Sequence, residues 1–171
     1  MQTPQTTDTL FIRPYQPSDL PEMAALFYRT VHEVNARDYT REQLDVWATG
    51  QIDEARWSRS LQEHISLVAV SGGLIVGFAD MDPSGYLDRL YIHADHQHRG
   101  IATALCDRLE AGVTGDISTH ASITARGFFE KRGYLVLREQ QGVLQGVPLT
   151  NYVMLKARPA ASSPFQRGVQ E

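Results

Sequence analysis

Apolar side chains recur with two different spacings along this chain, and the spacing changes from one segment to the next. Ile101, Leu105, Leu109 and Val113 stand at every fourth position, which predicts an amphipathic helix over residues 101–113. Other segments are short apolar runs bounded by Gly, Pro, Ser or Asp, a pattern typical of strands. Together they favour a mixed α/β sheet flanked by helices. In chain order we expect a strand at 10–14, helices at 18–34, 40–47 and 54–62, strands at 65–70, 74–80 and 86–93, the helix at 101–113, a strand at 116–120, a helix at 124–133, and strands at 134–141 and 149–156.

Polar residues support several of these boundaries. Thr40 and Gln43 have the spacing of a capping box, so a helix is expected to begin there. Asp19 is a cap-type residue in front of the first helix, and Thr124 has the same place before the last one. Residues 71–73, Ser-Gly-Gly, predict a tight hairpin turn, whereas residues 142–148 predict a longer loop.

Composition narrows the class of protein. With 171 residues, 42% of them hydrophobic, the chain suits one domain, which we place at residues 1–157, followed by a flexible tail at 158–171. A net charge of −4 argues against a general nucleic-acid binder. No apolar run approaches the ~20 residues of a membrane span, so we expect a soluble cytoplasmic protein with no membrane partner. The single cysteine, Cys106, cannot form an internal disulfide.

The turn between the strand at 86–93 and the helix at 101–113 is suited to an anion. Free backbone N–H groups and the positive end of the helix dipole meet there. Gly100 lets a ligand approach the backbone, and Arg99 adds a positive charge. A purely structural turn is the alternative. The glycine patterns of nucleotide P-loops and dinucleotide folds are absent from the sequence.

Two sequence blocks carry a resemblance to a known family. Residues 97–102, Gln-His-Arg-Gly-Ile-Ala, resemble motif A of the GNAT superfamily of N-acetyltransferases, Gln/Arg-x-x-Gly-x-Gly/Ala. Residues 121–134 resemble that family's later segment, Asn/Ser-x-x-Ala-x-x-Phe-Tyr-x-Lys-x-Gly-Phe. The resemblance covers residues 10–157. It implies a central, mostly antiparallel twisted sheet that splays after the fourth strand and is flanked by helices.

The resemblance also implies a cofactor, acetyl-coenzyme A, used as cosubstrate. Its pantetheine arm is expected to pair with the main chain around Leu90 to Ile92 like an added strand. Its pyrophosphate is expected on the amides of the turn that follows. The residues implied in cofactor binding are Leu90, Tyr91, Ile92, Gln97, His98, Arg99, Gly100, Ile101, Ala102, Thr103, Ser122, Ala125, Phe128, Phe129 and Lys131.

The implied reaction is acetyl transfer to a primary amine of a small molecule or peptide, by direct attack in a ternary complex. A general base must remove a proton from the amine. Asp88 is the first candidate, because we expect it to share a strand face with Leu90 and Ile92, where partial desolvation would raise its pKa. An ion pair with Arg89 is the alternative interpretation of Asp88.

His32 and His93 are further candidates for the base. His93, His96 and His98 also invite a zinc site. These three residues are spread over a strand end and a turn, however, so their imidazole rings need not point toward one common position. We therefore expect no metal.

One residue departs from the family pattern. Many members carry a tyrosine, acting as general acid toward the thiolate, where this chain has Phe129. Tyr91, Tyr134 and Tyr152 are candidates to replace it.

The acceptor side is expected on the first helices and the final hairpin. Tyr28, His32, Tyr39 and Trp47 are candidates there, with residues 142–150. A core position is the alternative for each aromatic residue. Two other functions stay open, a non-catalytic sensor of coenzyme A and a partner-binding domain without cofactor, and the resemblance leaves a homodimer open as well.

Overall fold

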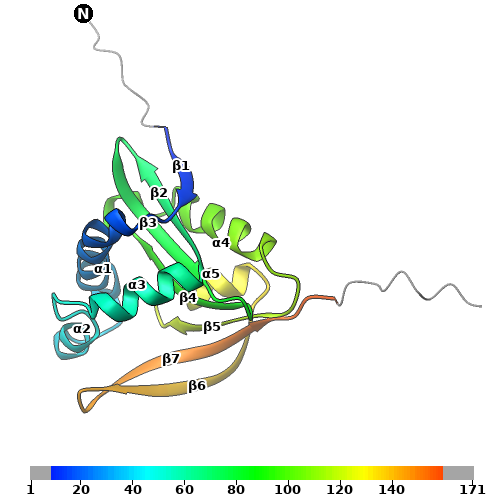
Figure 1. The fold of residues 1–171 in the computed structure, drawn as a ribbon. Coiled ribbons are helices and arrows are strands. Elements are labelled where there is room, and N and C mark those ends of the chain that lie inside the picture. The colour runs from blue at the N-terminus through cyan, green and yellow to red at the C-terminus, as the bar shows by residue number, and fades with distance from the viewer. Residues whose placement is uncertain (1–8, 160–171) are drawn as a thin grey trace, which may run out of the picture.

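The computed structural model describes residues 9–159, which form one seven-stranded sheet with helices on both faces (Figure 1). The strands lie in the order β1-β2-β3-β4-β5-β7-β6. The strands are β1 (Phe11–Pro14), β2 (Ile65–Ser71), β3 (Leu74–Met81), β4 (Tyr86–Ile92), β5 (Ile117–Ser122), β6 (Leu135–Leu144) and β7 (Val147–Lys156). The helices are α1 (Leu20–Val34), α2 (Arg41–Trp47), α3 (Glu54–Glu63), α4 (Ile101–Ala111) and α5 (Arg126–Lys131), with 3₁₀ turns η1 (Pro17–Asp19), η2 (Asn35–Arg37) and η3 (Ala94–His96).

The centre of the sheet is split. Every neighbouring pair of strands is antiparallel except β4 and β5, which run parallel. These two strands pair at only two positions, Tyr86 with Ser118 and Leu87 with Thr119. Beyond Leu87 they separate, so the sheet opens toward the end of β4. The predicted fold class is confirmed, and the two-residue pairing agrees with the expected splay after the fourth strand.

Two apolar clusters hold the helices on the sheet. On one face, α1, α2 and α3 pack over β2 and β3, where Met23, Leu44 and Leu61 meet Val68 and Phe78. On the other face, α4 and α5 cover the sheet. The predicted stripe of α4 is confirmed, since Ile101, Leu105 and Leu109 are at most 3% exposed. Among residues 9–159, no helix has the length and apolarity that a membrane-spanning helix needs.

The final hairpin differs from the expectation. Residues 142–148 do not form a long loop, because β6 and β7 continue to Leu144 and from Val147. Gln145 and Gly146 both have positive φ, 48° and 77°, as a two-residue type I′ turn requires. Their left-handed conformation lets the strands pair almost to the turn, so this prediction was wrong.

The described residues include the beginning of the predicted tail. Residues 1–8 and 160–171, which include most of the predicted tail, lie outside the described residues. Arg158, the first residue of that predicted tail, is anchored: its guanidinium donates to the Glu110 carbonyl at 2.6 Å and its amide to Asp116 Oδ1 at 2.8 Å.

Candidate active site

Asp88 lies at a β-bulge in β4. Asp80 on β3 is opposite Arg89, whereas the next residue, Met81, is opposite Leu87. Asp88 is therefore one extra residue in β4 with no partner on β3. A bulge of this kind bends the strand locally and redirects the side chains on either side of it.

The bulge changes which face Asp88 occupies. Leu90 and Ile92 pack into the apolar cluster under α4. Asp88 instead lines a cavity together with Tyr91, whose ring belongs to the cluster under α1–α3. The expectation that Asp88 shares a face with Leu90 and Ile92 was wrong, because it assumed an unbroken alternation along β4.

The cavity on this face has a volume of about 420 Å³ and combines aromatic walls with ionisable groups. The Asp88 side chain is 34% exposed. Partial burial, and then the neighbouring Asp80 carboxylate, raise the pKa of Asp88 above its ordinary value. Burial also raises the pKa of Tyr86 to about 12. The lining residues are Phe27, Trp47, Arg56, Trp57, Ser60, His64, Asp82, Tyr86, Asp88, Arg89 and Tyr91.

A charged network lies against this cavity. Asp80 is fully buried and its Oδ2 accepts from Arg89 at 2.7 Å, while His64 Nδ1 lies 2.6 Å from the same oxygen. Arg89 also donates to Ser60 Oγ at 2.9 Å and its guanidinium lies 4.5 Å from the centre of the Trp57 ring. The hydrogen bond that His64 donates to Asp80 raises the pKa of His64.

Arg89 pairs more closely with Asp80 than with Asp88. Its guanidinium is 3.5 Å from Asp88 Oδ2, a distance at which the structure has an ion pair but no hydrogen bond. The alternative interpretation of Asp88 as a partner of Arg89 is thus present as a secondary contact. The Asp88 carboxylate keeps its hydrogen-bonding capacity for a ligand in the cavity.

His64, Asp80 and Asp88 are the one group of three metal-type ligands that the described residues bring together, with one ligating atom of each within 4.8 Å of the others. The guanidinium of Arg89 already lies at hydrogen-bonding distance from Asp80 and close to Asp88. A cation in this place would compete with that fixed positive charge. The donor set therefore does not fit a metal ion.

The edge of β4 next to β5 faces the gap between the two strands. The strand positions from Asp88 to Ile92 have no cross-strand partner on β5 in the described part of the chain. The Ile92 carbonyl accepts from Thr30 Oγ1 at 3.3 Å and from Gln97 Nε2 at 2.7 Å. The gap is thus a place where an extended molecule can pair with the main chain of β4.

The turn before α4 has the geometry that a phosphate needs. Gly100 is the N-cap with φ 80° and ψ 9°, and no side chain caps the helix. The amides of the first turn, from Ile101 to Thr103, therefore point toward the gap end of α4 without a side-chain acceptor. No atom lies within 4 Å of the place where a Gly100 side chain would begin. His98 also has a positive φ, 58°.

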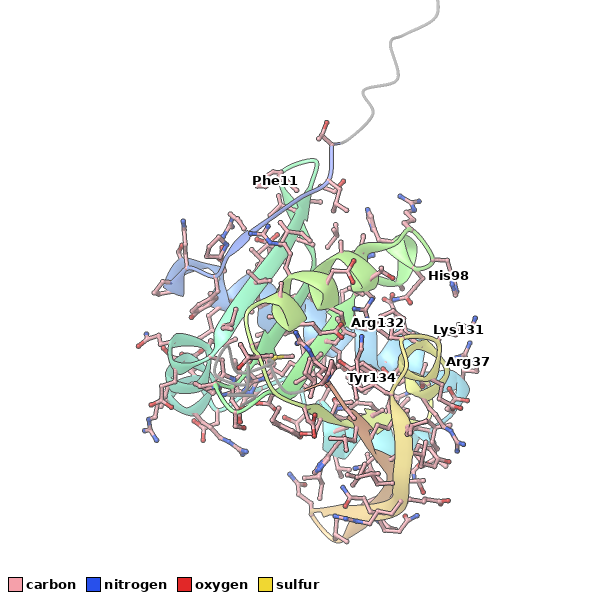
Figure 2. The ribbon with its side chains drawn as sticks, turned by 90° about the vertical axis from the view of Figure 1, so that its right-hand side faces the viewer. Phe11, Arg37, His98, Lys131, Arg132 and Tyr134 are labelled. Carbon is pink, nitrogen blue, oxygen red and sulfur yellow. The ribbon has the colours of Figure 1, made fainter. Side chains whose placement is uncertain are left out.

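Gln97 and Arg99 have separate places in this turn. The Gln97 side chain reaches back to the end of β4 and fixes the turn against that strand. Arg99 is exposed. Figure 2 shows His98 at the N-terminal end of α4, with Lys131 and Arg132 at the end of α5.

The second block lies where β5 runs into α5, and one detail differs from the expectation. Thr124 does not cap α5: it accepts from Asn35 Nδ2 at 3.1 Å, while Ser122 Oγ accepts from the Ala125 amide at 3.1 Å. The N-cap of α5 is Ala125, without a side-chain hydrogen bond. The long-range bond to Asn35 competes with the local cap, so that prediction was wrong.

The aromatic and basic residues of α5 have different surroundings. Phe129 is 2% exposed and packs edge-on against Tyr134 and Phe128, so its ring is part of the core. Arg132 is committed to ion pairs with Asp107 and Glu110 of α4. Lys131 is exposed and makes no ion pair with any residue of the described range 9–159.

The predicted acceptor residues divide between two places. Trp47 lines the cavity beside Asp88 and donates from Nε1 to the Tyr91 hydroxyl at 3.3 Å. Tyr28 lies in a second hollow, between α1 and residues 50–52. Its ring is tilted against that of His32, with 4.3 Å between the ring centres, and His32 Nε2 contacts the Ala48 carbonyl at 2.8 Å. Tyr39 is buried.

The remaining candidates from the sequence are also separated. His93 accepts from the Asp95 amide at 3.0 Å in the turn after β4 and does not line the cavity. Of the three tyrosines considered as acids, Tyr91 lines the cavity, and burial raises its pKa to about 12. Tyr134 lies in the core, and Tyr152 packs under the Arg126 guanidinium.

Sequence reasoning missed His64 and Asp80, and it named Arg89 only as a possible ion-pair partner of Asp88. They come from the start of β2, the end of β3 and the middle of β4, so no local spacing connects them. One signal was available: Asp80 ends a run of apolar strand residues, and a buried carboxylate needs charged partners.

Comparison with known proteins agrees with this geometry. Residues 35–156 match the family model of the acetyltransferase (GNAT) domain. An uncharacterized N-acetyltransferase of Escherichia coli, YafP, is 34% identical over 143 residues, covering 84% of this chain and 93% of YafP. A GCN5-related N-acetyltransferase structure from Rhodopseudomonas palustris is 33% identical with a TM-score of 0.83, covering 90% of this chain and 99% of that one.

A more distant structure shows the same fold with a ligand. The PaiA N-acetyltransferase from Thermoplasma acidophilum, solved in complex with coenzyme A, is 17% identical with a TM-score of 0.71, over 88% of this chain and 99% of that one. The matched domain spans the split sheet, the turn before α4 and the β5–α5 block. The chain belongs to the GNAT acetyltransferase family.

Proposed function

We propose that this protein transfers the acetyl group of acetyl-coenzyme A to a primary amine in a ternary complex. The observation that carries the proposal is the separation of the parallel strands β4 and β5 beside an uncapped helix N-terminus. A cavity with a carboxylate lies against the face of the same strand that α1–α3 cover. The two ligands would thus approach β4 from different sides.

The residues around the gap fit the cosubstrate. Main-chain groups of Leu90 to Ile92 would bind its extended arm, and the amides after Gly100 would bind its pyrophosphate. The exposed Lys131 side chain can approach a phosphate of the cosubstrate. The buried Phe129 ring would affect cosubstrate binding only by supporting the core beneath the site. When bound, acetyl-coenzyme A supplies an activated acetyl group as a thioester.

On the other side of β4, Asp88 would hold the amine and take its proton, directly or through one water. Its raised pKa makes it a better base than an ordinary carboxylate. The aromatic wall formed by Trp47, Trp57 and Tyr91 would exclude water from the amine. Tyr28 would contact only an acceptor long enough to reach the hollow beside α1, and His32 would act there through its contact with the Tyr28 ring.

Binding of the cosubstrate is tested by calorimetric titration with acetyl-coenzyme A. Gly100→Glu places a negative side chain at the α4 N-terminus and should abolish binding. Gly115→Glu is the matched control, because Gly115 also has open space around it but lies beyond the other end of α4. No binding by the wild-type protein at ~1 mM, about −4 kcal/mol, would contradict the proposal.

Turnover is tested by thiol release with benzylamine, 1,4-diaminobutane and alanine amide as acceptors. We expect amine-dependent release that Asp88→Asn lowers by about 10²-fold or more. Binding without thiol release for any amine would favour the coenzyme A sensor instead. That outcome would agree with the missing tyrosine at Phe129.

A further inference from the structure

A histidine outside both family blocks lies in the cavity beside Asp88. His64 follows α3 directly, and its ring forms part of the cavity lining. Its Nδ1 is taken by Asp80 Oδ2 at 2.6 Å. No residue of the described chain bonds the second ring nitrogen, Nε2, and that atom is not among the buried polar atoms without a partner. Nε2 is therefore the nitrogen available to a ligand or water in the cavity.

Asp80 fixes the orientation of this ring. The carboxylate is fully buried at the end of β3, and Arg89 holds the same oxygen from β4 at 2.7 Å. An acceptor-only carboxylate at Nδ1 selects the neutral imidazole with its proton on Nδ1. Nε2 then carries the lone pair, as a general base requires.

His64 and Asp88 are close enough to exchange a proton. A ring nitrogen of His64 lies within 4.8 Å of an Asp88 carboxylate oxygen. Both side chains line the same cavity, where water can connect the ring to that carboxylate. The two residues come from different parts of the chain, His64 from the position before β2 and Asp88 from the bulge of β4.

We propose that His64 is a second catalytic residue, which receives through Nε2 the proton that Asp88 draws from the amine, and that Asp80 is its positioning residue. The inference rests on the proposed acetyl transfer. In that reaction a C–N bond forms between amine and acetyl carbon and the C–S bond breaks. One proton passes from the nitrogen to Asp88 and on to His64, which releases it to solvent, and the departing thiolate takes one proton from solvent.

The charges around His64 favour this direction of transfer. The negative charges that face His64 are those of Asp80, Asp82 and Asp88, and the positive charges are those of Arg56 and Arg89. The neutral neighbours in the cavity are Ser60 and Tyr86. The pKa of His64 is raised above the ordinary 6.5, first by the hydrogen bond that the ring donates to Asp80. The imidazolium that a proton from Asp88 would create is thus stabilised by the Asp80 carboxylate beside it.

The ring state is tested by NMR titration of the ligand-free protein labelled with ¹⁵N-histidine. We expect the neutral His64 ring to carry its proton on Nδ1 and to titrate above 6.5, and Asp80→Asn to lower that pKa. His120, exposed on β5 and not among the residues that line the cavity, serves as the internal reference in the labelled spectra. A neutral ring protonated on Nε2, or a His64 titration that Asp80→Asn does not move, would overturn the assignment.

The catalytic role is tested with the acceptor from the amine panel that gives the fastest thiol release. His64→Gln should lower kcat at least about tenfold, leave acetyl-coenzyme A binding unchanged, and remove the acid limb of the pH profile. Asp80→Asn should shift that limb to lower pH, and His120→Gln should leave rate and profile unchanged. If His64→Gln keeps the wild-type pH profile, the relay is refuted while the proposed acetyl transfer stands. If the wild-type protein does not bind acetyl-coenzyme A, the proposed acetyl transfer itself is refuted.

Discussion

Tyr39 shows how a residue expected to face a ligand serves the fold. Its hydroxyl donates to the Thr150 carbonyl at 2.7 Å and accepts from the Ile123 amide at 2.9 Å. The ring is 8% exposed and packs edge-on against Trp47. One side chain thus joins the segment before α2 to β7 and to the β5–α5 connection. It positions Trp47 in the cavity wall without itself lining the cavity.

Removing only that hydroxyl should be costly. Tyr39→Phe leaves the Ile123 amide and the Thr150 carbonyl without their partner, and we expect the free energy of unfolding to fall by about 1–3 kcal/mol. Urea denaturation measures the change. Tyr28→Phe is the control, because Tyr28 is 40% exposed, and it should stay within about 0.5 kcal/mol of the wild type. Equal effects of the two variants would contradict this role.

Asp19 should give stability a dependence on pH. Its two carboxylate oxygens each accept from Arg13 at 2.8 Å, and this hydrogen bonding lowers the pKa of Asp19 below its ordinary 3.8. Because the folded pKa is the lower one, the stabilisation is complete above the unfolded pKa and is lost as pH falls through the folded pKa.

Asp19→Asn should therefore lower the free energy of unfolding by about 1.5–3 kcal/mol at pH 7. The difference from wild type should shrink when urea denaturation is repeated below pH 4. Asp45→Asn, in an ion pair whose carboxylate is 54% exposed, should cost less than about 1 kcal/mol at pH 7. A difference for Asp19→Asn that is constant with pH would argue against the Arg13 pair as its source.

At the scale of single elements, the turn before α4 depends on a backbone conformation. Gly100 has φ 80° with open space around it, so an alanine meets strain but no clash. We expect Gly100→Ala to cost about 1–2 kcal/mol in thermal or urea unfolding. Gly115→Ala has open space and no positive φ, so it should be close to neutral. A neutral Gly100→Ala would show that the turn readily changes conformation.

Elements set by local chemistry could be predicted from the sequence. The capping box at Thr40 and Gln43 is present as expected, and the hairpin turn falls at Gly72 and Gly73. Both depend on residues within a few positions of one another. The same holds for the phosphate-type turn at Gly100.

Features set by distant partners could not be predicted. The bulge at Asp88 depends on how β3 pairs with β4, and an alternating pattern gives no sign of one extra residue. Thr124 looks like a helix cap in sequence but bonds Asn35, 89 positions away. The pairing of His64 with Asp80 likewise requires the fold to bring the ends of β2 and β3 together.

At the scale of the whole molecule, the sheet consists of two parts with little pairing between them. Strands β1–β4 form one part and β5, β7 and β6 the other, joined by two residue pairs and by the core beneath α4 and α5 (Figure 1). Backbone amides near the gap have fewer partners than those in the centre of each part, and such regions open more readily.

Hydrogen exchange followed by mass spectrometry should reveal this division. Without ligand, peptides covering residues 88–92 should exchange faster than those from β2 and β3, which pair on both edges. Added acetyl-coenzyme A should slow exchange at 88–92 and in the turn 97–103. Unchanged exchange there, with ligand bound, would place the binding site elsewhere.

The open centre of the sheet also ties the lifetime of the folded chain to its proposed cosubstrate. A ligand that pairs with β4 fills the position of a missing strand and binds only the folded protein. By mass action, a concentration 100 times the Kd adds about 2.7 kcal/mol to the free energy of unfolding. Resistance to heat and to proteolysis would then rise and fall with the supply of acetyl donor, and depletion of that donor would leave the chain more exposed to degradation.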